Sequence, residues 1–167
     1  DNNMVTTDST ITVSALVVDS TSFTVTVNGV QATITPQGRV EVAVALTEGM
    51  NTITIAATDG VGNTTTVTRT VRRDSAPPTL SITQPVNGLF TRADSIVVSG
   101  TASDPQPGGA PPGQVTVTVD GIAVAVASDG AFSGHAVLQT QGSNTIIVVA
   151  SDSVGNKRTE TRTVFRD

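Results

Sequence analysis

The chain has 167 residues, with 9 Lys and Arg against 14 Asp and Glu, so that its net charge is −5, and it contains no Cys. This acidic balance argues against binding to nucleic acid or to an anionic membrane, because both require clustered Lys and Arg. Val, Ile and Thr are abundant while Trp and Tyr are absent, a composition that favours pleated strands.

The predicted elements are strands, because apolar residues alternate with polar ones. In chain order, the alternating runs of the first half cover residues 11–17, 23–27, 40–46 and 53–57. Turn-forming residues separate the runs. Asn28-Gly29 is the strongest of these signals, since both central residues of a type I′ hairpin turn need a positive φ.

The second half of the chain repeats the first. "NTITIAATDGVGNTTT", which starts at Asn51, returns as "NTIIVVASDSVGNKRT" from Asn144. "TRTVRRD", which ends at Asp74, returns as "TRTVFRD", which ends at Asp167. A repeat of this length predicts two globular units. Short alternating strands separated by turns predict that each unit is a sandwich of two antiparallel sheets.

The order of these motifs resembles that of a known group. An "NG" hairpin is followed by an alternating run, then by "EGMNTITIAATDGVGN" and a Thr-rich strand that ends "TRTVRRD". This order resembles the tandem bacterial immunoglobulin-like modules of secreted and cell-surface proteins, and it is similar to the accessory immunoglobulin-like domain of glucodextranase. The resemblance implies an all-β chain of two tandem immunoglobulin-like antiparallel β-sandwiches, at residues 1–74 and 80–167, joined by a short Pro-Pro linker at 75–79.

The first unit is predicted to lack its N-terminal strand. In the second unit, residues 79–83 alternate and form a first strand ahead of Asn87. Asn2 aligns with Asn87, so the equivalent strand would lie before Asn2. We therefore expect an open sheet edge in the first unit, either solvated or filled by a neighbouring chain, and a segment cut from a longer array.

Nothing in the sequence predicts an enzyme. His135 lies in a strand run without a marked partner, and the few Glu residues are scattered, whereas glycosidic hydrolysis needs two converging carboxylates. Modules that bind polysaccharides usually present exposed Trp or Tyr, and both are absent. Phe23, Phe132 and Phe165 lie in alternating runs and are expected in the core.

Four carboxylates form a candidate metal site. Loops of the second unit are expected to bring Asp104, Asp129 and Asp152 to the end where the linker enters, next to Asp74. Such a group could hold Ca²⁺, which takes six to eight oxygen ligands, and no other cofactor is expected. The alternative is that these Asp residues accept backbone hydrogen bonds in turns.

These observations predict a non-catalytic spacer segment of a larger extracellular or cell-surface bacterial protein, whose partners are neighbouring domains of the same chain. Two alternatives stay open. One is an accessory or carbohydrate-contacting module of a secreted glycan-degrading enzyme. The other is an adhesin module that binds a surface protein. Neither a nucleic-acid partner nor membrane insertion is expected.

Overall fold

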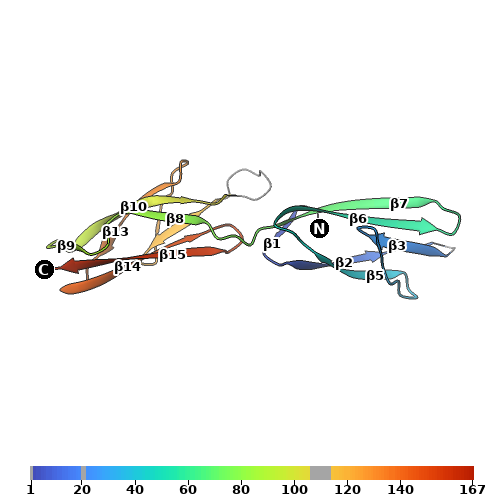
Figure 1. The fold of residues 1–167 in the computed structure, drawn as a ribbon, viewed down its shortest axis with the longest axis horizontal. Coiled ribbons are helices and arrows are strands. Elements are labelled where there is room, and N and C mark those ends of the chain that lie inside the picture. The colour runs from blue at the N-terminus through green and yellow to red at the C-terminus, as the bar shows by residue number, and fades with distance from the viewer. Residues whose placement is uncertain (1, 20–21, 106–113) are drawn as a thin grey trace. The chain divides into compact units, whose positions relative to one another are not determined.

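The structure is a computed structural model that describes residues 2–19, 22–105 and 114–167 (Figure 1). The chain folds into two compact units, Asp1–Ser75 and Ala76–Asp167, and their boundary lies inside the predicted linker. Every regular element of the described part is a β-strand, which confirms the predicted fold class. Within those residues there is no helix long and apolar enough to cross a membrane.

The first unit is a sandwich of two sheets. Its strands are β1 (Met4–Thr6), β2 (Thr10–Leu16), β3 (Phe23–Val27), β4 (Val30–Gln31), β5 (Arg39–Ala45), β6 (Gly49–Asp59) and β7 (Thr64–Arg73). One sheet has the order β1-β7-β6-β3-β4, and the other consists of β2 and β5. The pairs are antiparallel except for β1, which lies parallel to the end of β7.

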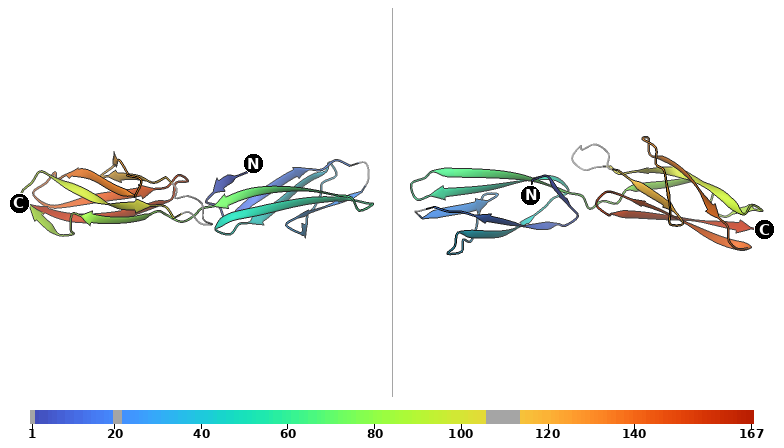
Figure 2. Two further views of the ribbon diagram at one scale, coloured as in Figure 1. Left: turned by 90° about the horizontal axis from the view of Figure 1, so that it is seen from above. Right: turned by 180° about the vertical axis from the view of Figure 1, so that it is seen from behind.

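The second unit repeats this arrangement with one more strand. Its strands are β8 (Thr79–Gln84), β9 (Leu89–Thr91), β10 (Ser95–Ser103), β11 (Thr116–Val119), β12 (Ile122–Val124), β13 (Ala131–Val137), β14 (Gly142–Ser151) and β15 (Lys157–Arg166). Its sheets have the orders β12-β11-β14-β15-β9 and β13-β10-β8. Figure 2 shows the strands of each unit from two further sides. Strands β9 to β15 correspond one by one to β1 to β7.

Two hairpin turns have the backbone that their residues predict. φ is 50° and 80° in Asn28-Gly29, and 47° and 83° in Asp120-Gly121. Asn, Asp and Gly tolerate such angles better than other residues do. The first side chain of each pair also accepts a backbone N–H from the adjacent strand, that of Thr54 or of Ile147, at 2.8 Å. Each turn is therefore tied to the neighbouring strand of its sheet.

The inward-facing residues of the strands make one apolar core in each unit. In β3, Val25 and Val27 are 0% and 2% exposed, and their counterparts in β11, Val117 and Val119, are 1% and 0% exposed. Full burial of a side chain of this size stabilises a fold by about 1.5–3 kcal/mol. The alternation read from the sequence is thus the alternation between core and solvent.

The structure confirms that the first unit lacks its N-terminal strand. Residues 4–6 form β1, which pairs with β7 as β9 pairs with β15, so they are not the counterpart of β8. In the second unit, β8 covers the free edge of β10. Among the described residues of the first unit, β2 pairs with β5 alone. The predicted open sheet edge is therefore the outer edge of β2.

Candidate functional site

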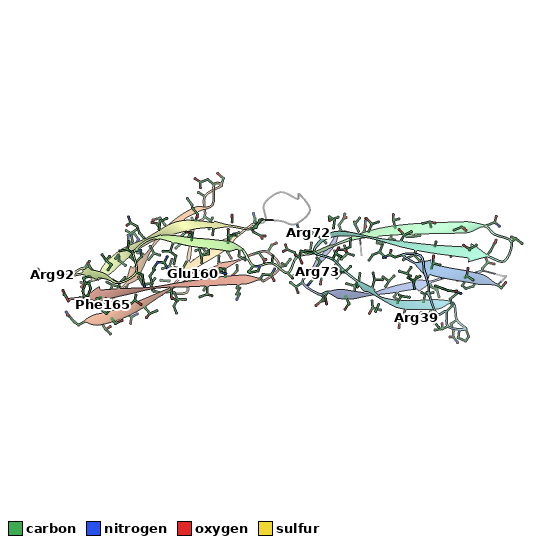
Figure 3. All side chains as sticks on the ribbon, viewed as in Figure 1. Arg39, Arg72, Arg73, Arg92, Glu160 and Phe165 are labelled. Carbon is green, nitrogen blue, oxygen red and sulfur yellow. The ribbon has the colours of Figure 1, made fainter. Side chains whose placement is uncertain are left out.

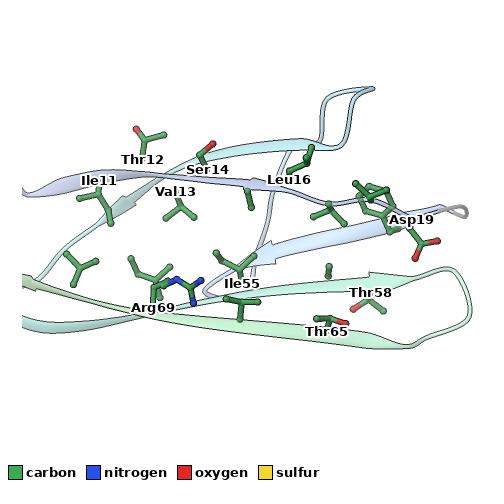
Figure 4. A pocket seen from close by; sticks show the side chains of 18 of the residues that line it. Ile11, Thr12, Val13, Ser14, Leu16, Asp19, Ile55, Thr58, Thr65 and Arg69 are labelled. Atoms are coloured by element: carbon green, nitrogen blue, oxygen red, sulfur yellow. The ribbon is translucent and has the colours of Figure 1, made fainter. Parts of the chain in front are cut away.

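A groove of about 900 Å³ runs along β2 in the first unit (Figure 4). It lies between β2 and the facing strands β6 and β7, with Val13 on one side and Ile55 and Arg69 on the other. Val13 and Ile55 are only half-buried. Their counterparts in the second unit, Val98 and Val148, are both 0% exposed. The groove is thus the space that β8 closes in the second unit.

The repeated Asp-x-Val-Gly-Asn turns use their carboxylates to fix the backbone. The Asp59 carboxylate accepts the N–H of Val61 at 3.0 Å and that of Asn63 at 2.8 Å, and it also accepts the Asn63 side-chain amide at 2.7 Å. The Asn63 amide, with these backbone N–H groups, holds the pKa of Asp59 below its usual value of 3.8. Asp152 makes the equivalent bonds to its own turn.

Two of the four predicted calcium ligands lie together in the second unit. Asp104 directly follows β10 and Asp152 directly follows β14. They are 1% and 8% exposed, and one carboxylate oxygen of each lies within 4.8 Å of the other. Two carboxylates supply at most four of the oxygens that Ca²⁺ requires. The calcium site therefore stays a prediction.

The other two predicted ligands have local partners. Asp74 follows β7 in the first unit, where its N–H donates to the Thr6 carbonyl at 2.9 Å and its carboxylate lies 3.6 Å from Arg72. Figure 3 labels Arg72 near the end of β7. Asp129 is exposed in the turn before β13 and accepts the N–H of Ala131 at 3.0 Å. Each of these two carboxylates is thus engaged by a neighbour in its own unit.

The residues considered for catalysis are spread over the surface. His135 is exposed on β13. The three Glu carboxylates each lie beside an Arg, with Glu41 at 2.7 Å from Arg39, Glu48 at 3.7 Å from Arg73 and Glu160 at 3.0 Å from Arg158. Such exposed pairs contribute little to stability. In the described part of the chain, no two Glu residues converge on a common site.

An aromatic pair lies on the outer face of the second unit. Phe90 is 67% exposed, and its ring stacks on that of Phe165, with centroids 4.8 Å apart and planes at 16°. The expectation that Phe165 lies in the core is wrong, because Val164 faces inward at 0% exposure and successive residues of a strand face opposite sides. Phe132, by contrast, is buried as expected.

Comparison with known proteins assigns the family. The family model described as "Glucodextranase, domain B" matches residues 1–75 and 78–167. The chain belongs to the glucodextranase domain B family. The two matched segments fall on the two units, so that both units resemble domain B along almost their full length.

Further matches are more distant or partial. Bacillopeptidase F of Bacillus subtilis (strain 168) is 32% identical to this domain B chain over 124 residues, which are 74% of the chain and 8% of that protein. Among solved structures, the fibronectin(III)-like modules of Clostridium thermocellum CbhA are 15% identical to this chain, with a TM-score of 0.47. The match covers 99% of this chain and 89% of the CbhA chain. Domains 3–5 of Drosophila OTK are 13% identical to this chain, with a TM-score of 0.48. That match covers 99% of this chain and 59% of the OTK chain.

We predict that Asn63→Ala raises the pKa of Asp59 towards 3.8, because it removes the main hydrogen bond to the carboxylate. A ¹³C NMR titration of the carboxyl group measures this. The folded pKa of Asp59 lies below its unfolded value, so its contribution to stability is present above about pH 4 and is lost as pH falls through the folded pKa. Asn156→Ala, in the equivalent turn, should leave Asp59 unchanged. An unaltered pKa in Asn63→Ala would show that the amide is not the cause.

We expect Ca²⁺, added after chelation, to raise the melting temperature, since a ligand that binds only the folded state stabilises it by about 2.7 kcal/mol at 100 times Kd. Asp104→Asn should abolish the rise, because it removes one of the two adjoining buried carboxylates. Asp8→Asn makes the same charge change in the first unit, and this variant should keep the calcium-dependent rise in melting temperature. Calorimetry with no calcium-dependent shift in the unmutated chain would rule the site out.

Proposed function

We propose that the chain is a non-catalytic spacer segment of a larger extracellular or cell-surface bacterial protein, with neighbouring domains of the same polypeptide as its partners. The path of the chain through the second unit carries this proposal. Thr79, the first residue of β8, pairs with Ser103 at the end of β10. Arg166, the last residue of β15, forms an ion pair with Asp94, just before β10 begins. The chain thus enters and leaves at opposite ends of one long strand.

This path suits a module that holds its two neighbouring domains apart. β10 runs from Ser95 to Ser103, which is about 30 Å at roughly 3.3 Å per residue. Tension between the two ends acts along the strands, so the ladder hydrogen bonds beside β8 and β15 are loaded together. β15 pairs with β14 over its whole length. β8 is held by β10 and by Arg162, which donates to the Ile82 carbonyl at 3.0 Å.

The remaining side-chain chemistry supports a structural role. Carboxylates and amides of the turns bind backbone groups, and the Glu residues pair with neighbouring Arg residues. In Bacillopeptidase F the matched region makes up 8% of the protein, which supports the view that such modules are parts of longer chains.

We predict that pulling the chain by its ends produces two unfolding events of unequal force. The second unit should resist more, because its ends lie at opposite ends of the sandwich, and its unfolding should release about 280 Å, from about 3.4 Å per residue less the folded span. In the first unit, Met4 lies beside Val71, so the same tension loads only the three-residue pairing of β1 with β7. Single-molecule force spectroscopy makes the measurement.

Arg162→Ala should lower the force of the second event alone, since it removes a bond that holds β8. A second unit that yields at the same force as the first, or earlier, would contradict the spacer function.

The exposed ring of Phe90 favours a second candidate, an accessory module that contacts glycan beside the catalytic domain of a secreted enzyme. Sugar rings stack on exposed aromatic faces, and the stack on Phe165 holds this ring in place. The family name, which is that of a domain of a glucan-cleaving enzyme, agrees with this candidate. The adhesin alternative would depend instead on the open edge of β2.

Affinity electrophoresis in α-glucans tests the glycan role. If it holds, the chain is retarded and Phe90→Ala loses most of the retardation, because about 1 kcal/mol of stacking is worth several-fold in Kd. Val86→Ala removes another exposed apolar side chain of the same unit and should change nothing. Migration unaffected by any glucan would remove this candidate.

A further inference from the structure

We propose that the groove along β2 is a docking site for one extended peptide strand of the same chemistry as β8, which pairs with the open edge of β2. The occupant is a strand with apolar residues at alternate positions, of the type Thr-Leu-Ser-Ile-Thr-Gln. The second unit provides the internal precedent, because β8 lies there on the counterparts of the same elements.

The groove keeps the side chain that would bind the backbone of such a strand. Arg162, on β15, donates one amino group to the Thr161 carbonyl at 2.9 Å and the other to the Ile82 carbonyl of β8 at 3.0 Å. Arg69 is its counterpart on β7 and makes the equivalent bond to Thr68, also at 2.9 Å. Arg69 is exposed in the groove, directed from β7 towards β2 (Figure 4), whereas Arg162 is half-buried beneath β8.

The edge of β2 has none of the features that usually protect a free strand edge. Free edges are kept from pairing by short strands, by charged residues or by Pro. Other edge strands of this chain show such features. β4 is only two residues long and β12 only three, and β5 carries the charged residues Arg39 and Glu41. β2 has seven residues, Thr-Ile-Thr-Val-Ser-Ala-Leu, with neither a charge nor a Pro. Its unpaired edge is therefore suited to pairing.

The two faces of this edge specify what the occupant should be. On the groove side, Val13 and Val17 are half-buried where Val98 and Ala102 are buried in the second unit, so an inward Leu or Ile of the docked strand would complete the core. On the outer side, Leu16 is 70% exposed. Its counterpart Thr101 is polar and lies opposite Ser81 of β8. An apolar residue in place of Ser81 would therefore add a contact with Leu16 to those of the inward-facing residues.

One position differs between the two sites. A Cβ at Gly100 would overlap the carbonyl oxygen of Ser81 and crowd the Phe132 ring. The first unit has Ala15 in place of Gly100, and the smaller Val40 in place of Phe132. A strand docked on β2 must therefore lie farther from Ala15 than β8 lies from Gly100.

Two formats of one experiment test the proposal on the full chain. In the first, the synthetic peptide of residues 76–87 is added in trans. In the second, residues 76–86 are joined directly ahead of Asn2, which raises the effective concentration of the strand. Hydrogen exchange should show new protection along residues 10–16, and the linked version should melt the first unit about 4–8 °C or more higher.

Two peptide variants and two substitutions in the chain sharpen the result. A peptide with Leu80→Ser and Ile82→Ser should not protect β2, and a peptide with Ser81→Val should bind several-fold more tightly than the unmodified one. Arg69→Gln should weaken binding several-fold without lowering the melting temperature of the free chain. Arg162→Gln, its matched control, should destabilise the second unit and leave binding to β2 unchanged.

Absence of protection at β2 in both formats would overturn the proposal. Binding that is unchanged by Leu80→Ser and Ile82→Ser would also overturn it, because the groove would then not bind the apolar side chains of the strand. Sedimentation of the free chain checks the other occupant. Dimers that protect residues 10–16 without added strand would mean that a second copy, rather than a β8-like peptide, occupies the edge.

Discussion

The contact between the apolar faces of two sheets is the interaction on which each unit depends. Every second residue of a strand reaches that contact, and most of these residues are Val, Ile or Ala, so a short strand supplies only two or three buried side chains. One strand is therefore a large share of the core. Where β8 is present, Val98, Val148 and Ala150 are 0% exposed, and where its counterpart is missing, Val13, Ile55 and Ala57 are half-buried. A unit of about this size has little surplus burial to offset such a loss.

The polar groups mostly serve the backbone that carries this core. The Asn51 side-chain amide donates to the carbonyls of Thr47 and Gly49 at 2.7 and 2.9 Å, and Asn144 repeats the same pair of bonds at 2.8 and 3.1 Å. Together with the Asp-x-Val-Gly-Asn turns, these bonds explain why the longest repeated stretch of the sequence is so similar in both halves. It contains one long central strand and the turns that bound it, and both need the same local hydrogen bonds in each unit.

The two-residue period and the turn pairs were sufficient to predict the longer strands, the two sandwiches and the missing strand, because these features depend on local sequence and on the internal alignment. Contacts between distant segments could not be derived in the same way. The proximity of Asp104 and Asp152 was expected only from the strand order of an immunoglobulin-like sandwich. The contact of Arg162 with Ile82 joins strands far apart in the chain and was not predicted. The error at Phe165 has a local cause, since Val164 and Phe165 are both apolar and the pattern alone does not say which faces inward.

The open edge of β2 also bears on how the first unit could transmit tension. In the second unit, β8 begins at one end of the sandwich and β15 ends at the other, so the core lies between the points where the chain enters and leaves. In the first unit, β1 lies parallel to the last residues of β7, with Thr6 beside Arg73, and tension between them bypasses the core. A strand docked antiparallel to β2 and continuous with Asn2 would move the loaded end to the far side of the sandwich. Completing the core and placing it under tension are therefore consequences of the same pairing.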